Sequence, residues 1–274
     1  GDRLENLEKM INAVEETQKR GLNRAEHRLH LRCELPHHTT LPLFEKLVGR
    51  EPVSLVSLMD HSPGQRQFAN IEKYREYYQG KYSLNDAEMA RYEEEQLQLA
   101  AQWSQPNRLS IAAMCRDRNI ALASHDDATH DHVRESHQLG SVIAEFPTTF
   151  EAAEASRKHG MNVLMGAPNI VRGGSHSGNV AASRLASLGL LDILSSDYYP
   201  ASLLDAAFRV ADDENNSFTL PQAIRLVTKN PASALNLHDR GEIAEGKRAD
   251  LVLAHRKGEH IHIDHVWRQG KRVF

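Results

Sequence analysis

Polar and ionisable side chains follow apolar segments at several points along this chain. The segment 120–127, IALASHDD, begins as an apolar run and ends in His125, Asp126 and Asp127. Burying such groups costs free energy unless each is hydrogen-bonded, paired or bound to a metal. Imidazoles and carboxylates are the groups that proteins use for metal binding and acid–base chemistry. Other apolar segments end in the same way, at Glu34, Asp60, His61, Glu145, Asn169 and Asp197.

The segments that would position these residues alternate between strand-like and helix-like patterns. This alternation predicts an α/β fold with a parallel sheet covered by helices on both sides. The carboxyl ends of parallel strands lie at one edge of a sheet, where active sites are found, so we expect the polar groups to converge. The strand-like segments are 27–35, 53–61, 120–126, 141–146, 162–167 and 192–197.

A converging set of imidazoles and carboxylates suits a divalent metal such as Zn²⁺, because it supplies nitrogen and oxygen ligands and leaves a position for water. The sequence predicts Glu34, His61, His125 and Asp197 as this set. A single histidine at a strand end is more often a structural hydrogen-bonding group. The four ends together favour a metal site.

The strand-like segments also predict which side chains share a face. Period-two alternation places His125 with Ala123 toward the interior and Leu122 toward the helices. In the segment 27–35, HRLHLRCEL, polar residues alternate with apolar ones, although a parallel strand buried on both sides should be apolar throughout. The polar face therefore lines an active site, or the strand is an exposed edge, or both.

A glycine-rich segment after the fifth of these strands, VRGGSHSGNVAAS, is a candidate anion site. Glycines allow the backbone to approach a ligand closely, and N–H groups at a helix start favour an anion. We expect the following helix to open at Gly178 and Asn179. A flexible Gly/Ser loop is the alternative. The predicted phosphate-binding residues are Arg172, Gly173, Gly174, Ser175 and His176.

Other segments predict helices. The first helix ends before Gly21, and a later one opens at Thr148 or Thr149. The segment 62–106 is too long for an ordinary connection, so it forms either a lid over the site or a plain helical insertion. Within it, the charged run at 91–96 is predicted to be a solvated helix face.

The composition is that of an ordinary globular protein. The 274 residues are 40% hydrophobic and 26% charged, enough for one large barrel or two domains. A net charge of −4, with both signs interspersed, gives no reason to expect a nucleic acid or a membrane surface as partner. We expect neither a signal peptide nor a membrane span. Two cysteines are too few for a disulfide framework, which predicts a cytoplasmic protein.

The tail, from Gly241, differs from the rest in having short strands and turns, which predicts a small β subdomain over 241–274 beside a main domain over 1–240. Its sequence GEIAEGKRADLVL resembles the segment by which amidohydrolase-superfamily enzymes return to their small β-sandwich. The motifs HLRCELPHHTTLPLFEKL and APNIVRGGSHSGN extend the resemblance along the whole chain. So do Glu34 in HLRCE, His61 in MDHSPGQ, His125 in SHDDATHDH and Asp197 in LSSDYYP.

The resemblance implies a TIM-like (β/α)8 barrel of the metal-dependent hydrolase type, with its metal centre at the top of the strands. Glu34 matches a bridging carboxylate of the superfamily, and Asp197 matches its strand-eight aspartate. His61 and His125 would then lie on strands four and five. This assignment implies that strands one and two, with further metal ligands and half of the sandwich, are lacking here. Zinc is the first expectation for the metal, with iron or manganese as alternatives.

The resemblance is most specific to members that act in phosphonate catabolism. It implies a diphosphatase that hydrolyses a small phosphonate-bearing ribose 5-triphosphate to the 5-phosphate and pyrophosphate. Asp197 would be metal ligand and general base, and Arg172 would hold the polyphosphate. One alternative is a C–N hydrolase such as a deacetylase or cyclic amidase. Another is a non-catalytic fragment or binding subunit. A homo-oligomer is the macromolecular assembly to consider.

Overall fold

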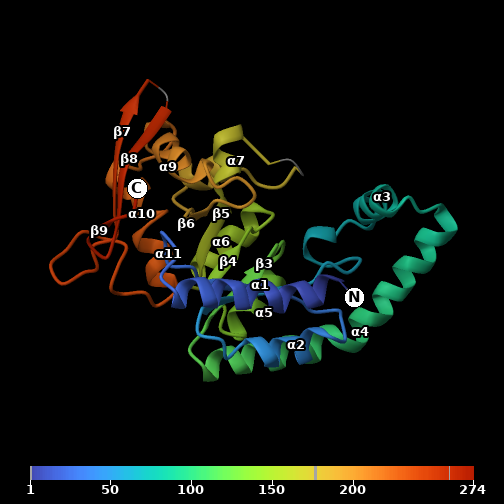
Figure 1. Cartoon of the computed structure of the whole chain (residues 1–274). Helices are drawn as coiled ribbons and strands as arrows, with labels where there is room; N and C mark the ends of the chain where they lie inside the picture. The colour runs from blue at the N-terminus through green and yellow to red at the C-terminus, as the bar shows by residue number, and fades with distance from the viewer. Residues whose placement is uncertain (1, 176–177, 259) are drawn as a thin grey trace.

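The computed structural model describes residues 2–175, 178–258 and 260–274. Its centre is a six-stranded sheet whose strands follow one another in sequence order, each parallel to its neighbours (Figure 1). The α/β class and the six predicted strands are confirmed. The strands are β1 (Leu29–Glu34), β2 (Val53–Met59), β3 (Ala121–His125), β4 (Ile143–Glu145), β5 (Asn162–Gly166) and β6 (Ile193–Ser195).

Helices connect the strands. Thr149 caps α6 as the sequence predicted, with its hydroxyl accepting from the Ala152 N–H at 3.0 Å. The helix predicted to open at Gly178 begins later, at Ala182, so that prediction was wrong. The Asn169 side chain explains the shift, because it accepts from the Ala182 N–H at 3.0 Å. The helices outside the 66–95 region are α1 (Asp2–Lys19), α2 (Thr40–Leu47), α5 (His130–Gln138), α6 (Phe150–Lys158), α7 (Ala167–Arg172), α8 (Ala182–Ser187), α9 (Ser202–Asp212), α10 (Leu220–Arg225) and α11 (Lys229–Ala234).

The two faces of the sheet carry separate apolar clusters. On the outer face, Leu122 and Cys33 pack with Ile11 of α1 and with residues of α2 and α4 (Asp86–Asp117). On the inner face, Ala123 packs with Ile143 and with residues of β5 and β6. The predicted division of 120–126 into an inward and a helix-facing side is therefore confirmed. His125 continues the inner side and so reaches the strand-end edge of the sheet.

Strand β1 lies at the edge of this sheet and pairs with β2. Cys33 is buried in the outer cluster, whereas Arg32 is exposed. His30 approaches Ser57 of β2, with 2.9 Å between the imidazole Nε2 and the hydroxyl oxygen. Both explanations offered for the polar face hold: β1 is an edge strand, and its polar side turns toward the strand-end site.

The long connection after β2 is a helical insertion, which we call the aromatic arm (residues 66–95). It comprises η1 (Arg66–Phe68), α3 (Ile71–Tyr82) and the start of α4 (Asp86–Asp117), and it extends away from the sheet (Figure 1). The arm has its own small core, in which Tyr74 and Phe68 are buried. The predicted solvated face at 91–96 is helical, with Arg91, Glu94 and Glu95 exposed, but Glu93 departs from it: it is 9% exposed and pairs with Arg75.

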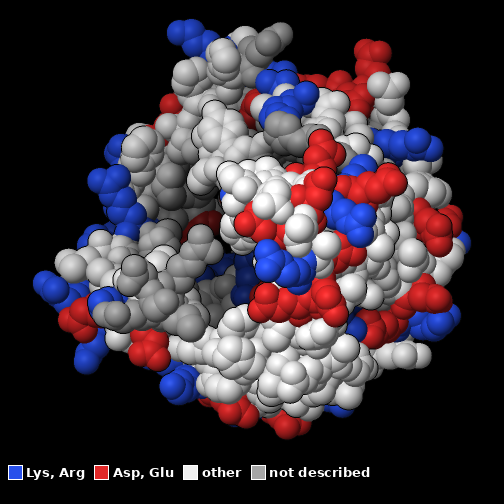
Figure 2. Space-filling model, turned by 90° about the vertical axis from the view of Figure 1, so that its right-hand side faces the viewer, with Lys and Arg blue, Asp and Glu red and all other residues white. Residues whose placement is uncertain are grey.

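The tail forms a second, antiparallel sheet on the side of the molecule opposite the arm (Figure 1). Its strands are β7 (Leu251–Lys257), β8 (His260–Arg268) and β9 (Lys271–Arg272). Strands β7 and β8, which we call the tail hairpin, contact α9 through the Arg256–Asp212 ion pair. Positive and negative side chains are interspersed over the face shown in Figure 2. Among the described helices, none has the length and apolar content needed to span a membrane.

Candidate metal centre

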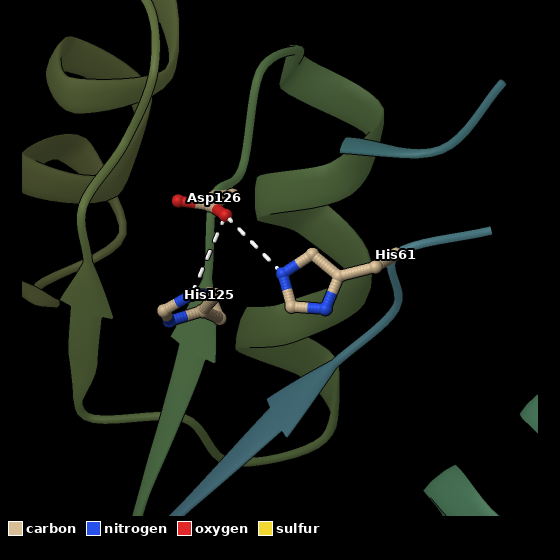
Figure 3. Close-up of side chains that lie close together, drawn as sticks. All are labelled: His61, His125 and Asp126. Carbon is tan, nitrogen blue, oxygen red and sulfur yellow. Dashed lines mark ion pairs between the residues drawn. The ribbon is translucent and has the colours of Figure 1, made fainter. Parts of the chain in front are cut away.

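Three potential metal ligands meet at the carboxyl ends of β2 and β3. His61 follows the end of β2, His125 is the last residue of β3, and Asp126 comes next (Figure 3). One ligand atom from each lies within 4.8 Å of the others, and within the described part of the chain this is the one such group of three. These three side chains therefore converge at the edge of the sheet where the sequence predicted that polar groups would meet.

The three side chains point toward a common position. The Asp126 Oδ2 atom lies 3.4 Å from Nε2 of His125 and 3.8 Å from Nε2 of His61. The two imidazole rings are 5.7 Å apart between centroids and inclined at 80°. Ligand atoms held tetrahedrally at about 2.0–2.1 Å from Zn²⁺ are roughly 3.3 Å apart. The donor types and their spacing thus fit a zinc-like divalent cation.

Each imidazole has a second carboxylate on its other nitrogen. Glu34 lies 2.6 Å from Nδ1 of His61 and also accepts from the His61 backbone N–H. Glu145, at the end of β4, lies 2.8 Å from Nδ1 of His125. Both Nε2 atoms are consequently the ones that face Asp126.

The electrostatic environment favours positive charge at this position. Burial opposes a charged His61, but the carboxylates of Asp126 and Glu34 outweigh that effect and raise the pKa of the imidazole to about 9. Burial would raise the pKa of Glu145, yet its hydrogen bond with His125 lowers that pKa below the usual range. A divalent cation would be stabilised by the same carboxylates.

A buried network of charged side chains supports the two loops that carry the site. Arg66 pairs with Asp127 and, at 3.0 Å, with Glu135. Arg108 of α4 joins Glu135, at 2.7 Å, to Asp60, at 3.2 Å. Burial and repulsion from Arg108 lower the pKa of Arg66 to about 10, so it remains charged at neutral pH. Asp60 precedes His61 and Asp127 follows Asp126, so the network holds both ligand-bearing loops.

A cavity of about 330 Å³ opens above the strand ends. Asp197 lines it together with His61 and His125, and its Oδ2 lies 3.3 Å from where a Cβ on Gly166 would stand. Asp197 follows β6 in a left-handed conformation, with φ +49°. The structure thus places Asp197 in the same cavity but outside the group of three ligand atoms.

The predicted phosphate-binding segment borders the same cavity. Arg172 ends α7 and donates to the Tyr198 hydroxyl at 2.6 Å. Gly173 follows with φ +81°, which favours glycine, and turns the chain. Gly174 and Ser175 line the cavity beside Arg172. His176 lies outside the described residues, and its predicted role stays a prediction.

A family comparison covers most of the chain. The model of the amidohydrolase family matches residues 26–274. The chain belongs to the amidohydrolase family. The predicted superfamily resemblance is thereby confirmed, and a divalent metal is the cofactor that this family implies. The His61, His125 and Asp126 cluster supplies a donor set that fits it.

Individual relatives extend the comparison. Alpha-D-ribose 1-methylphosphonate 5-triphosphate diphosphatase of Escherichia coli strain K12 is 89% identical over 274 residues, covering 100% of this chain and 72% of the relative. Adenine deaminase of Ligilactobacillus salivarius is 34% identical over 125 residues, covering 42% of this chain and 21% of the relative. A solved adenosine deaminase from Xanthomonas campestris with bound zinc is 17% identical, with a TM-score of 0.48, covering 84% of this chain and 54% of that one.

The amidohydrolase site contains one potential ligand that the sequence did not predict. Asp126 was recognised as an ionisable strand-end residue, but alternation places it on the opposite face from His125. The structure instead gives Asp126 a φ of +56°, which turns its side chain back toward the imidazoles. Asp and Asn adopt this conformation more readily than most residues, and that preference is the signal that could have found it.

Proposed function

We propose that this amidohydrolase catalyses the metal-dependent hydrolysis of alpha-D-ribose 1-methylphosphonate 5-triphosphate to the 5-phosphate and pyrophosphate. The observation that carries the proposal is the 89% identity, along the whole chain, to the diphosphatase of that name. The strand-end cluster and the adjoining cavity support it, because the potential metal ligands lie beside cationic and glycine-rich segments.

The proposed metal site combines the predicted residues with the one that the geometry adds. His61, His125 and Asp126 would hold the ion, with zinc as the first candidate and iron or manganese as alternatives. Asp197 is proposed as a further ligand. Glu34 was also predicted as a ligand, but its contact is with Nδ1 of His61 and it lies outside the group of three, so we propose that it holds that ring. A bound divalent ion supplies Lewis acidity and an activated water.

The chain's own residues would bind the substrate and move the proton. Asp197, in the shared cavity, would accept a proton from the attacking water. The water oxygen bonds to the α-phosphorus, the bond from that phosphorus to its bridging oxygen breaks, and pyrophosphate leaves. Arg172 would pair with the polyphosphate, and Gly173, Gly174, Ser175 and His176 would complete that side of the site.

We also propose the finer architecture implied by the family. The six parallel strands would be strands three to eight of a (β/α)8 barrel that lacks its first two strands here, within a main domain over 1–240. The tail at 241–274 would be part of a small β-sandwich. The open order of the sheet, with β1 and β6 at its two edges, supports this assignment.

We propose a cytoplasmic setting for the protein. The buried free thiols of Cys33 and Cys115 support a reducing, cytoplasmic location. The substrate is a small molecule, and a homo-oligomer is proposed as the assembly. Sedimentation of the purified protein would test the oligomer.

Pyrophosphate release tests the proposed function, with Arg172→Met against Arg184→Met as the matched control. Arg184 is exposed on α8 and lies outside the cavity lining. Loss of one guanidinium that stabilises phosphoryl charge should lower kcat/KM about 10²-fold, whereas the control should keep the rate of the unaltered protein. Phosphorus NMR of the zinc-loaded protein with the triphosphate would measure this.

Two outcomes would contradict the proposal. One is the absence of pyrophosphate release by the unaltered, zinc-loaded protein. The other is equal activity in the Arg172 and Arg184 variants. A C–N hydrolase, the class to which the adenine deaminase relative belongs, would turn over an uncharged amide or adenine and tolerate Arg172→Met.

A further inference from the structure

We infer that Glu145 is a positioning residue, which fixes the His125 ring so that its Nε2 lone pair faces the cavity. The inference rests on the proposed metal site and deepens it by assigning a residue that touches no substrate. Glu145 was noted in the sequence as a strand-end carboxylate, but no role followed from its position there.

The hydrogen bond between the two side chains is short and shielded from water. The Nδ1 atom of His125 lies 2.8 Å from Oε2 of Glu145. The side chains are only 6% and 7% exposed, so water does not compete effectively for either group. A carboxylate is an acceptor only, and it therefore stabilises the tautomer with the proton on Nδ1. Nε2 then keeps the lone pair that a metal ligand needs.

The sheet itself fixes the pair. His125 and Glu145 are register partners on the adjacent parallel strands β3 and β4. The Asp126 N–H donates to the Glu145 carbonyl at 3.0 Å, which ties the next residue of the site to the same position. The Phe146 ring packs edge-on against His125, with 5.6 Å between centroids. The bond is therefore built into the fold.

Arg32 gives independent support for the assigned tautomer. Its Nη2 lies 3.4 Å from Nε2 of His125. A guanidinium has donors and no acceptor, so a hydrogen bond at this contact uses the lone pair on Nε2 of a neutral ring. That neutral ring has its proton on Nδ1, where Glu145 lies.

The second imidazole repeats the arrangement. Glu34 lies 2.6 Å from Nδ1 of His61, and Nε2 of His61 faces Asp126. The two pairs thus present the same ring nitrogen to the same carboxylate oxygen. They differ in burial, since the Glu34 side chain is 43% exposed and that of Glu145 is 7% exposed. Water can replace part of the Glu34 contact, so Glu145 should be the stronger positioning group.

The tail hairpin offers a matched control. His255 and Asp264 form the same kind of bond, also 2.8 Å long, but their side chains are 55% and 37% exposed. Asp264→Asn therefore removes the charge of an equivalent carboxylate while keeping an acceptor, which matches Glu145→Gln, and it does so at a place with no proposed ligand role. It leaves the strand-end site untouched.

The test compares zinc affinity in Glu145→Ala, Glu145→Gln and Asp264→Asn by competition with a chelator, without substrate. Loss of the orienting carboxylate should weaken zinc binding about 10- to 100-fold in Glu145→Ala. Glu145→Gln keeps an acceptor but loses the charge, so it should fall between Glu145→Ala and the unaltered protein. If Glu145→Ala does not fold, Glu145→Gln carries the test. Asp264→Asn should match the unaltered protein.

A second readout follows the ring itself. Nitrogen NMR of metal-free protein should show the Nδ1–H tautomer of His125 in the unaltered chain and a growing Nε2–H population in the Glu145 variants. Unchanged zinc affinity in the foldable Glu145 variants would overturn the inference, as would an unchanged tautomer. Weakened zinc binding in a protein that hydrolyses no triphosphate would leave the inference standing and reject the proposed function alone.

Discussion

The strand-end site and the tail hairpin contain the same side-chain types in very different surroundings. Each has a histidine whose Nδ1 lies 2.8 Å from a carboxylate oxygen, His125 with Glu145 and His255 with Asp264. The hairpin also stacks His255 on His262, with 5.4 Å between ring centroids. Only the strand-end residues form a described group of three ligand atoms close enough to share an ion. The residue types and the geometry of a single pair are therefore not enough to make a candidate metal site. The strand-end region differs from the hairpin because its side chains are buried and converge from separate strands.

Arginine–carboxylate pairs show the same contrast. Arg66 and Asp127 pair with 4% and 1% of their side chains exposed, while Arg256 and Asp212 pair on the surface at 45% and 44%. A buried pair cannot lose one member without leaving an uncompensated charge. An exposed pair can exchange its partner for water. The buried Arg66–Asp127 pair therefore contributes to the stability of the fold and also holds the loop that carries Asp126.

The largest expected difference between the two regions is in metal binding. His125→Ala removes an imidazole from the ligand cluster, so we expect zinc retention and triphosphate hydrolysis to fall to background. His255→Ala removes an exposed imidazole of the hairpin and should change neither. The amount of zinc per chain, measured by mass spectrometry after gel filtration, would test this difference between the two variants. Equal losses in the two variants would mean that the regions do not differ as described.

The second expected difference, in the free energy of unfolding, is smaller than the difference in metal binding. Arg66→Met leaves Asp127 buried without its cation, whereas Glu135 keeps Arg108. The uncompensated charge of Asp127 should lower the free energy of unfolding by roughly 3–5 kcal/mol. Arg256→Met exposes Asp212 to water, and a change of at most about 1 kcal/mol is expected. Urea unfolding of both variants would measure the contrast. Similar values for the two would show that the arginine pairs are not distinguished by burial.

The smallest effect is expected for a pair of intermediate burial. Burial would raise the pKa of Glu26, but hydrogen bonds from Arg248 and Arg240 outweigh it and lower that pKa from 4.5 to about 2. A depressed folded-state pKa stabilises the protein above pH 4.5, and this stabilisation is lost as the pH falls toward 2. Glu26→Gln should remove this part of the acid sensitivity, on the order of 1 kcal/mol after solvent screening. The free energy of unfolding should therefore change less with pH across this range in the variant. If the pH dependence of the free energy of unfolding is unchanged in Glu26→Gln, Glu26 does not contribute to the acid sensitivity.

Local pattern predicted much of the fold because its strands are short apolar runs with polar ends. The runs ending near Met59 and His125 are strands in the structure, and the alternation around Leu122 and Ala123 gives their two sides correctly. The start of α8 was missed because its cap comes from Asn169, a residue on another helix. A contact between segments that are distant in the sequence, such as this cap, produces no local sequence pattern from which it could be predicted.

The site was predicted in part for the same reasons. Convergence of His61 and His125 followed from their positions at the ends of neighbouring parallel strands. The role of Asp126 depends on one backbone angle, which alternation cannot show. The Arg66 and Arg108 network depends on helix packing across the whole domain. The predicted roles of Asp197 and Arg172 stay predictions that the hydrolysis experiments address.

Position 126 has two independent requirements, one on the backbone conformation and one on the charge of the side chain. With φ at +56°, the residue must tolerate a left-handed conformation, which admits Gly, Asn and Asp most easily. Of these three, only aspartate brings an anionic oxygen. A saturation library at this position should therefore separate into many variants that fold poorly, a few that fold without holding zinc, and the parental residue that does both. Under the proposed metal site, adaptation to another cation would have to begin at His61 or His125.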